Sequence, residues 1–384
     1  MKICFVCPEY PPGPHGGIGW FTRTLAHGLV RMGHQVRVAG VYPKSWPSEG
    51  REDDEGVEVW RLRDPEYFLS WVRMRVRLYR LISSWCRAGE ADLVEVPDSR
   101  GQAALWPSLP VPVVARLHIS RTVSAAHLGG SLKPMSRWLE LKSLQRADFW
   151  CSVSRNVADE TRRIFGLEKA GLEVIYNPVV VPDLDPMGER KPGFAVFHGT
   201  YNHNKGVERL VEAWLRVRET VPNAELHLFG KDGRTASGAW MIAHLVSRFG
   251  DLGRHGVHLG RFVGHEVLAE VLRSASVAVY PSLSEAFALA PMEAMAHGAP
   301  TIFTQRCSGP ELIEHEVDGL LVDPESPAQI ADAILRVLRD RELAQRLGEA
   351  GRRKMETRFA LPMILEQNVR FYESCIAKFR RAAR

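Results

Sequence analysis

Short apolar, β-branched runs recur along the 384-residue chain, each followed by a polar or Gly/Pro turn and then by helical spacing. The runs of the first half are Ile3–Cys7, Gln35–Val41, Leu93–Val96, Val111–Leu117, Phe149–Val153 and Glu173–Tyr176. Those of the second half are Phe194–Phe197, Glu225–Phe229, Val257–Leu259, Val277–Tyr280, Pro300–Phe303 and Gly319–Val322. Six strands are therefore predicted in each half, alternating with helices as in parallel sheets.

A proline-rich segment separates the two halves. Residues 177–193, "NPVVVPDLDPMGERKPG", contain four prolines and have no helical period. We therefore predict an α/β protein with two Rossmann-like, doubly wound parallel-sheet domains, at 1–177 and 193–361, joined by a hinge at 178–192. Such sheets bind ligands at the carboxyl ends of their strands, so we expect the active site in a cleft between the domains.

The composition is that of a globular protein. The residues AVILMFWYC make up 45% and the charged residues 25%, which excludes disordered and fibrous classes. No apolar run approaches the ~20 residues of a membrane-spanning helix. Six scattered cysteines are typical of a reducing compartment, so we expect a cytoplasmic protein.

The net charge of +5 does not by itself indicate a nucleic-acid partner, but its distribution is uneven. The stretch Trp71–Arg87 holds five arginines and no acid, and 374–384 holds four basic residues and no acid. One interpretation is contact with an anionic surface at the inner face of the plasma membrane through Arg73, Arg75, Arg77 and Arg80. The other is a surface helix whose arginine stems cover apolar neighbours.

A glycine-rich loop follows the first predicted strand. In Pro11–Trp20, "PPGPHGGIGW", the glycines allow a ligand close to the backbone at a helix N-terminus, where free N–H groups favour anions. The loop is not GxGxxG, and the chain contains no GxxxxGK[ST]. The chain therefore lacks the nucleotide-binding fingerprint that a nicotinamide-dependent oxidoreductase requires.

The most informative segment is Ser284–Pro300, "SEAFALAPMEAMAHGAP", which follows a predicted strand. Glu285 precedes a helix start near Ala288, and Glu293 comes eight residues after Glu285. The N–H groups of Ala288 and Leu289 can bind phosphate, and the two carboxylates can accept from hydroxyls. A sugar nucleotide carries both kinds of group. The alanines around the two acids argue against a solvated surface helix.

The Glu-x7-Glu pattern after Tyr-Pro-Ser, followed by "MAHGAP", "SGPELI" and "DGLLVDP", resembles the retaining glycosyltransferases of family 4, which have the two-Rossmann GT-B fold. The same resemblance includes "PEYPPGPHGGIG", "RLH", "SVSR", "VIYNPV" and "HGTYNHNKGVERLVEAW", in this order along most of the chain. It implies that a C-terminal helix at 362–384 packs back on the first domain.

The resemblance assigns catalytic roles to three residues. It places Glu285 at the donor sugar and Lys205, before Gly206, at the diphosphate. His118 ends an apolar run, and the resemblance gives it a hydrogen bond to the donor sugar or its leaving phosphate. Glu293 would bind the ribose of the nucleotide.

Further donor-binding positions follow from the same resemblance. Gly17 would contact the diphosphate or the acceptor, and Gly230 belongs to "FGKDG", which resembles the turn that meets the nucleobase. Gly199 and Thr200 stand where the family usually has Gly-Arg, so one cation is missing, and His203 or a neighbouring arginine is the expected substitute. The donor-binding set is Gly17, Gly199, Thr200, Lys205, Gly230, Phe287, Ala288, Leu289 and Glu293.

The function that the resemblance implies is transfer of a sugar from a UDP- or GDP-sugar to a hydroxyl acceptor, with retention of configuration and without metal or cofactor. The expected acceptor is a polysaccharide, a lipopolysaccharide or a lipid-linked glycan. One alternative is a sugar-nucleotide epimerase on the same fold. Another is a catalytically impaired sugar-nucleotide-binding protein, because Thr200 stands where the family usually has an arginine.

Overall fold

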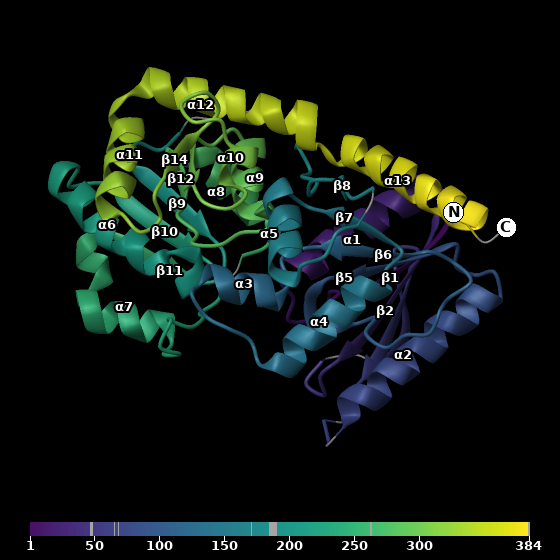
Figure 1. The fold of residues 1–384 in the computed structure, drawn as a ribbon. Helices are drawn as coiled ribbons and strands as arrows, with labels where there is room; N and C mark the ends of the chain where they lie inside the picture. The colour runs from purple at the N-terminus through teal and green to yellow at the C-terminus, as the bar shows by residue number, and fades with distance from the viewer. Residues whose placement is uncertain are drawn as a thin grey trace. The chain divides into compact units, whose positions relative to one another are not determined.

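The computed structural model describes residues 1–46, 49–64, 66–67, 69–169, 171–183, 190–261 and 263–382. The chain divides into two compact units (Figure 1). The first unit comprises Met1–Pro178 and Leu361–Arg384, and the second comprises Val179–Ala360. The predicted hinge at 178–192 begins at this division, and its residues 184–189 lie outside the described part of the chain.

The first unit is built on a sheet in the order β3-β4-β2-β1-β5-β6-β7-β8. Its strands are β1 (Lys2–Val6), β2 (Gln35–Tyr42), β3 (Gly50–Asp54), β4 (Val57–Arg63), β5 (Leu93–Pro97), β6 (Val113–Leu117), β7 (Phe149–Ser152) and β8 (Glu173–Val174). All neighbouring strands are parallel except β3 and β4. The strand order reverses between β1 and β5, as in a doubly wound fold.

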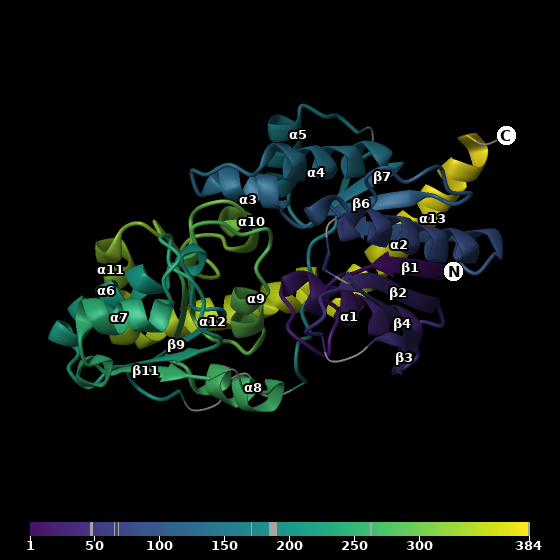
Figure 2. The same cartoon turned by 90° about the horizontal axis from the view of Figure 1, so that it is seen from below.

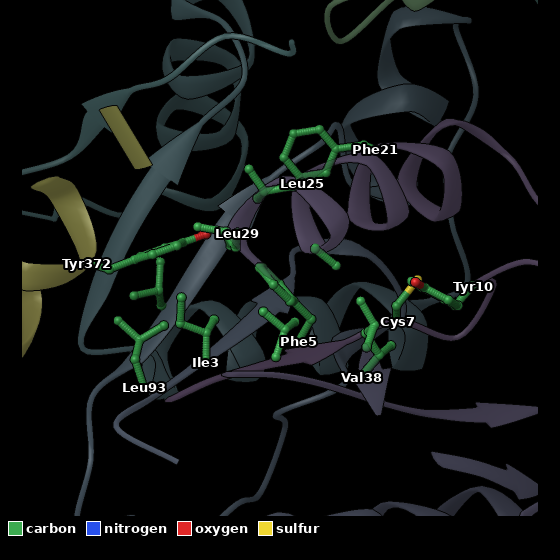
Figure 3. Close-up of a cluster of buried hydrophobic side chains, with 14 of the residues drawn as sticks. Ile3, Phe5, Cys7, Tyr10, Phe21, Leu25, Leu29, Val38, Leu93 and Tyr372 are labelled. Atoms are coloured by element: carbon green, nitrogen blue, oxygen red, sulfur yellow. The ribbon is translucent and has the colours of Figure 1, made fainter. Parts of the chain in front are cut away.

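The helices of this unit are α1 (Gly17–Arg31), α2 (Ser70–Arg87), η1 (Ser99–Gly101), α3 (Arg121–His127), α4 (Pro134–Arg146), α5 (Arg155–Phe165) and α13 (Leu361–Ala382). The apolar face of α1, with Leu25 and Leu29, packs on Ile3 and Phe5 of β1, and Tyr372 of α13 reaches the same core (Figure 3). The helix that ends the chain is therefore part of the first unit's core.

A buried polar network also joins α13 to the first sheet. Arg116 of β6 is 0% exposed and donates to both carboxylate oxygens of Glu95, at 2.7 and 2.9 Å. From α13, the Tyr372 hydroxyl donates to Glu95 Oε2 at 2.7 Å, and Asn368 accepts from Arg116. Breaking one partner of such a buried charged pair is costly, so this network fixes α13 on the sheet.

The basic stretch predicted as a surface helix forms α2. Arg73, Arg77 and Arg80 are exposed, but Arg75 is not part of their face. The guanidinium of Arg75 donates to the backbone carbonyls of Arg100 and Gly101, at 2.7 and 3.1 Å. The side chain of Arg75 therefore ties α2 to η1, and the membrane contact expected of it stays a prediction.

The second unit is built on an entirely parallel sheet in the order β11-β10-β9-β12-β13-β14. Its strands are β9 (Phe194–His198), β10 (Glu225–Phe229), β11 (Val257–Gly260), β12 (Val277–Tyr280), β13 (Thr301–Thr304) and β14 (Leu320–Val322). The strand order reverses between β9 and β12, so ligand binding is expected where the loops after these two strands meet.

The helical segments of the second unit are η2 (His203–Lys205), α6 (Val207–Thr220), α7 (Met241–Phe249), η3 (Leu252–His255), α8 (His265–Ser274), α9 (Leu289–Ala296), α10 (Gly309–Leu312), α11 (Pro327–Arg339), α12 (Arg341–Lys354) and η4 (Met355–Phe359). The helices α6 and α11 lie side by side in both views (Figures 1 and 2). Residues of α9 line the core, with Met292, Ala294, Met295 and Ala296 all 0% exposed.

The predicted fold class is confirmed, and each predicted run coincides with a strand whose ends differ by no more than two residues. The expectation of six strands in the first half is wrong, because β3 and β4 add an antiparallel hairpin at the edge of the sheet. Its turn has positive φ at both central residues, 52° at Glu55 and 89° at Gly56. This is the condition for a two-residue type I′ hairpin.

Candidate active site

The loops that follow β9 and β12 touch directly at the point where the strand order of the second sheet reverses. Gly206 has φ +69°, and a Cβ atom there would lie 1.9 Å from the carbonyl oxygen of Pro281. Only glycine fits this close approach. The contact brings η2, which carries Lys205, beside the segment that leads into α9.

Lys205 and Glu285, eighty positions apart in sequence, form an ion pair. The ammonium Nζ of Lys205 donates to Oε1 of Glu285 at 2.6 Å. Two further bonds fix the pair: Asn202 caps η2 by accepting from the Lys205 N–H, and the Asn204 amide donates to the Ser284 carbonyl at 2.9 Å. Because an ammonium has three donors, Lys205 can bind an anion while it holds Glu285.

The helix α9 begins at Leu289, four residues after Glu285. Its N-cap residue, Ala288, has φ −71° and ψ 129° and makes no side-chain capping bond to the first N–H groups. These groups and the helix dipole favour an anion. Since φ is negative at Ala288, alanine in place of glycine costs little there.

Glu293 lies within α9 and is held by a buried histidine. Nε2 of His198 lies 2.9 Å from Oε2 of Glu293, and the Tyr280 hydroxyl lies 2.7 Å from Nδ1 of His198. Burial, followed by the charge of Glu293, raises the pKa of Tyr280 far above its usual value. The tyrosine hydroxyl therefore stays protonated. In the imidazole tautomer that carries its proton on Nε2, His198 donates to Glu293 and accepts from this hydroxyl at Nδ1.

His198 is a further residue of this site, one that was not predicted from the sequence. It is the last residue of β9 and is followed by Gly199. A polar residue that ends an otherwise apolar strand, at the carboxyl edge of a parallel sheet, is the signal that could have found it.

Gly199, Thr200 and Gly230 lie together beside this group. A Cβ atom on Gly230 would stand 1.8 Å from the Gly199 carbonyl oxygen, so the loops after β9 and β10 are in contact, and Thr200 is exposed. The neighbouring arginine is Arg234, whose carbonyl accepts from the His203 N–H at 3.0 Å. Its guanidinium lies 3.5 Å from the centre of the Trp240 ring.

Phe287 differs from the other predicted donor-binding residues. Its side chain is 2% exposed and packs on Phe359, with ring centres 5.4 Å apart. Its ring therefore positions the loop before α9 and is not available to a ligand.

His118 and Gly17 belong to the first unit. His118 follows β6, and its ring packs edge-on against Phe21, with ring centres 4.8 Å apart. The backbone N–H of His118 donates to Oδ1 of Asp98 at 3.0 Å. Burial and the charge of Arg116 lower the pKa of His118 to about 3, so the imidazole is neutral at physiological pH. Burial raises the pKa of Asp98 to about 8.

The glycine-rich loop before α1 already holds an internal anion. Oε1 of Glu9 accepts from the N–H groups of Gly16 and Gly19, at 3.3 and 3.0 Å. A Cβ atom added at Gly17 would meet nothing within 4 Å. A ligand phosphate at the start of α1 would therefore share its donors with Glu9, a residue that the sequence analysis did not consider.

Two family models match the chain. The model for glycosyl transferases group 1 matches residues 187–354, and that for the glycosyl transferase 4-like domain matches residues 16–178. A glycogen synthase of Mycobacterium tuberculosis is 29% identical, over 94% of this chain and 91% of the relative.

Two solved structures show the same two-domain fold. Sucrose-phosphate synthase from Thermosynechococcus elongatus matches with a TM-score of 0.79 at 22% identity, over 98% of this chain and 99% of that chain. Anabaena HepE in complex with UDP-glucose matches with a TM-score of 0.73 at 18% identity, over 97% and 100% of the two chains.

Proposed function

Because the chain belongs to the group 1 glycosyltransferases and has the GT-B fold, we propose that it moves a sugar from a UDP- or GDP-sugar to a hydroxyl acceptor with retention of configuration. The observation that carries this proposal is the Lys205–Glu285 pair at the uncapped start of α9, with Glu293 further along the same helix. This arrangement offers a cation, free N–H groups and two carboxylates at one sheet edge.

The diphosphate would bind between Lys205 and the N-terminus of α9. Negative charge grows on the diphosphate as the sugar leaves, and preorganised donors that stabilise such charge are usually the largest catalytic contribution. Glu285 keeps Lys205 in place and can accept hydrogen bonds from sugar hydroxyls. The proposed reaction therefore uses no metal ion or organic cofactor.

The ribose would bind to Glu293, whose carboxylate is oriented by His198. His118, neutral at physiological pH, would donate a hydrogen bond to the donor sugar or its leaving phosphate. The acceptor hydroxyl would attack on the face from which the diphosphate departs and pass its proton to that phosphate. The complex of HepE with UDP-glucose supports a UDP-sugar donor, and the glycogen synthase relative supports a glycan acceptor.

The direct test compares Glu293→Gln with Glu342→Gln, which changes an exposed acid in the first turn of α12. Calorimetric titration with UDP, GDP and ADP should show weaker binding in Glu293→Gln, and turnover should fall, while the control matches the wild type. Unchanged nucleotide binding and turnover in Glu293→Gln would contradict the proposal.

The products distinguish retention from the two alternatives. NMR of the product should show the anomeric configuration of the donor. Epimerised donor without transfer would favour an epimerase, and nucleotide-sugar binding without any product would favour a catalytically impaired binding protein.

We also propose that α2 contacts an anionic membrane surface. Arg73, Arg77 and Arg80 line a groove of about 530 Å³ together with Tyr67 and Val76. Basic groups beside aromatic and aliphatic side chains suit lipid headgroups. Among the described residues, no helix is long and apolar enough to cross a bilayer.

Vesicle co-sedimentation tests this contact. Changing Arg73, Arg77 and Arg80 together to Gln should abolish salt-sensitive binding to vesicles that contain phosphatidylglycerol. A control removes the same charge from exposed arginines of the second unit, Arg254, Arg339 and Arg341, and should retain binding. Equal binding by both triple variants would refute the role of α2.

A further inference from the structure

Three side chains of metal-ligand type gather at an edge of the second sheet, away from the site described above. Glu225 and His227 lie two residues apart on β10 and so share one face of that strand, while Leu226 and Leu228 on the other face are 0% exposed. His258 lies on β11, the outermost strand, in register with His227. The parallel pairing places the two imidazoles next to each other.

The distances among these groups suit a single small cation. Nε2 of His227 is 3.0 Å from Oε2 of Glu225, and Nε2 of His258 is 3.8 Å from Oε1. The ligand atoms of the three residues all lie within 4.8 Å of one another. Bonds of ~2.0–2.1 Å in a tetrahedral zinc site separate neighbouring ligand atoms by about 3.4 Å, so small side-chain rotations would bring all three onto one ion.

The side chains are held in orientations that favour binding. Phe194 packs edge-on against the His227 ring at 4.8 Å, and Phe229 stacks on it at 6.3 Å. The Glu225 carboxylate is held by the same ring, because Nε2 of His227 lies 3.0 Å from its Oε2.

We propose that Glu225, His227 and His258 bind one divalent first-row transition-metal ion. Zinc is the expected metal, and water would be the fourth ligand. Two imidazoles and one carboxylate suit zinc, copper or nickel, whereas magnesium and calcium prefer oxygen ligands. The ion would tie the edge strand β11 to β10.

This metal site is separate from the proposed transfer reaction. Glu225 is the first residue of β10, whereas the donor-binding residues of the second unit lie at and beyond the carboxyl ends of β9, β10 and β12. The ion would therefore stabilise the sheet without taking part in the chemistry.

Calorimetric titration of the full, EDTA-treated chain with zinc chloride tests the site. The wild type should bind one zinc ion per chain, and magnesium should not compete. His258→Gln should weaken zinc binding about tenfold or more, because loss of even an outer-shell partner of a metal site costs 10–100-fold. The double variant His227→Gln/His258→Gln should lose the site.

The matched control is His255→Gln, which changes a histidine three residues before His258 and outside the cluster. It should bind zinc as the wild type does. Absence of zinc binding in the wild type, or undiminished binding in the double variant, would overturn the proposal. His258 has a side chain that is 44% exposed, so its substitution should leave the protein folded and able to bind UDP.

Two further measurements identify the ligands. Zinc affinity should fall as the pH is lowered, because protons compete with the metal for the imidazole nitrogens. Cobalt added in place of zinc should give a visible absorption band in the wild type and in His255→Gln. Persistence of that band in the double variant would show that the ion binds elsewhere and would refute the assignment.

Discussion

Replacing Tyr280 by Phe tests whether the buried chain of hydrogen bonds behind Glu293 serves nucleotide binding. The substitution removes the hydroxyl that donates to Nδ1 of His198 and changes little else. Without this donor, the imidazole is free to turn or to take the other tautomer. The bond from Nε2 of His198 to Glu293 is then no longer enforced.

The expected size of the effect of Tyr280→Phe follows from the loss of one buried, uncharged hydrogen bond, which contributes about 0.5–1.5 kcal/mol. If that energy serves to orient Glu293, the Kd for the nucleotide should rise about 2- to 13-fold. Calorimetry with UDP or GDP measures the affinity, and urea unfolding measures the stability.

The matched control for this experiment is Tyr42→Phe. The Tyr42 hydroxyl is buried in the first unit and donates to the Cys7 carbonyl at 2.6 Å. This variant should lose a similar amount of stability and bind nucleotide normally. If Tyr280→Phe also loses only stability and keeps the wild-type Kd, the hydroxyl serves packing alone and the reasoning is refuted.

Three other substitutions have defined outcomes. Tyr372→Phe removes a bond to the buried Glu95 carboxylate and should lower the free energy of unfolding by about 1.5–3 kcal/mol in urea titrations; a loss below about 0.5 kcal/mol would contradict the role of this network. Gly206→Ala should abolish nucleotide binding, because the new Cβ meets the Pro281 carbonyl, whereas Gly238→Ala, at φ +90° in open space, should not; equal effects would show that φ strain alone matters. Asp98→Asn should become more stable relative to the wild type as the pH rises from about 4 to 8. In this range the folded wild type keeps a proton on Asp98, whose pKa is raised to about 8, whereas the unfolded chain releases it, so the wild type loses stability with rising pH and the Asn variant does not. A difference in the free energy of unfolding that stays constant in urea titrations across this range would refute the raised pKa.

Much of the fold could be predicted because buried parallel strands are continuous apolar runs in the sequence. The hairpin of β3 and β4 escaped because its residues do not form such runs. The β3 strand, "GREDD", has no apolar residue, and β4, "VEVWRLR", alternates between apolar and polar positions. Both belong to a partly exposed edge, where alternation is the expected pattern, and Glu55-Gly56 was the turn signal between them.

The candidate site was predictable where a local motif carries it. Lys205 and Glu285 each lie in a recognisable segment, and the structure brings them within 2.6 Å. His198 and Glu9 were missed because their roles depend on partners that are seven or more residues away in the sequence. The bonds from Arg75 to η1 were missed because a charge pattern does not show which helix face packs inward.

The return of α13 to the first sheet has a consequence for folding during synthesis. The second unit is continuous in sequence, from Val179 to Ala360, and all of it leaves the ribosome before α13 does. The first unit leaves earlier but lacks Asn368 and Tyr372, which complete the bonds around Glu95 and Arg116. The first unit should therefore be the last to reach its final structure, although most of it is made first. Until the second unit and α13 have been made, the hydrogen bonds around Arg116 stay incomplete.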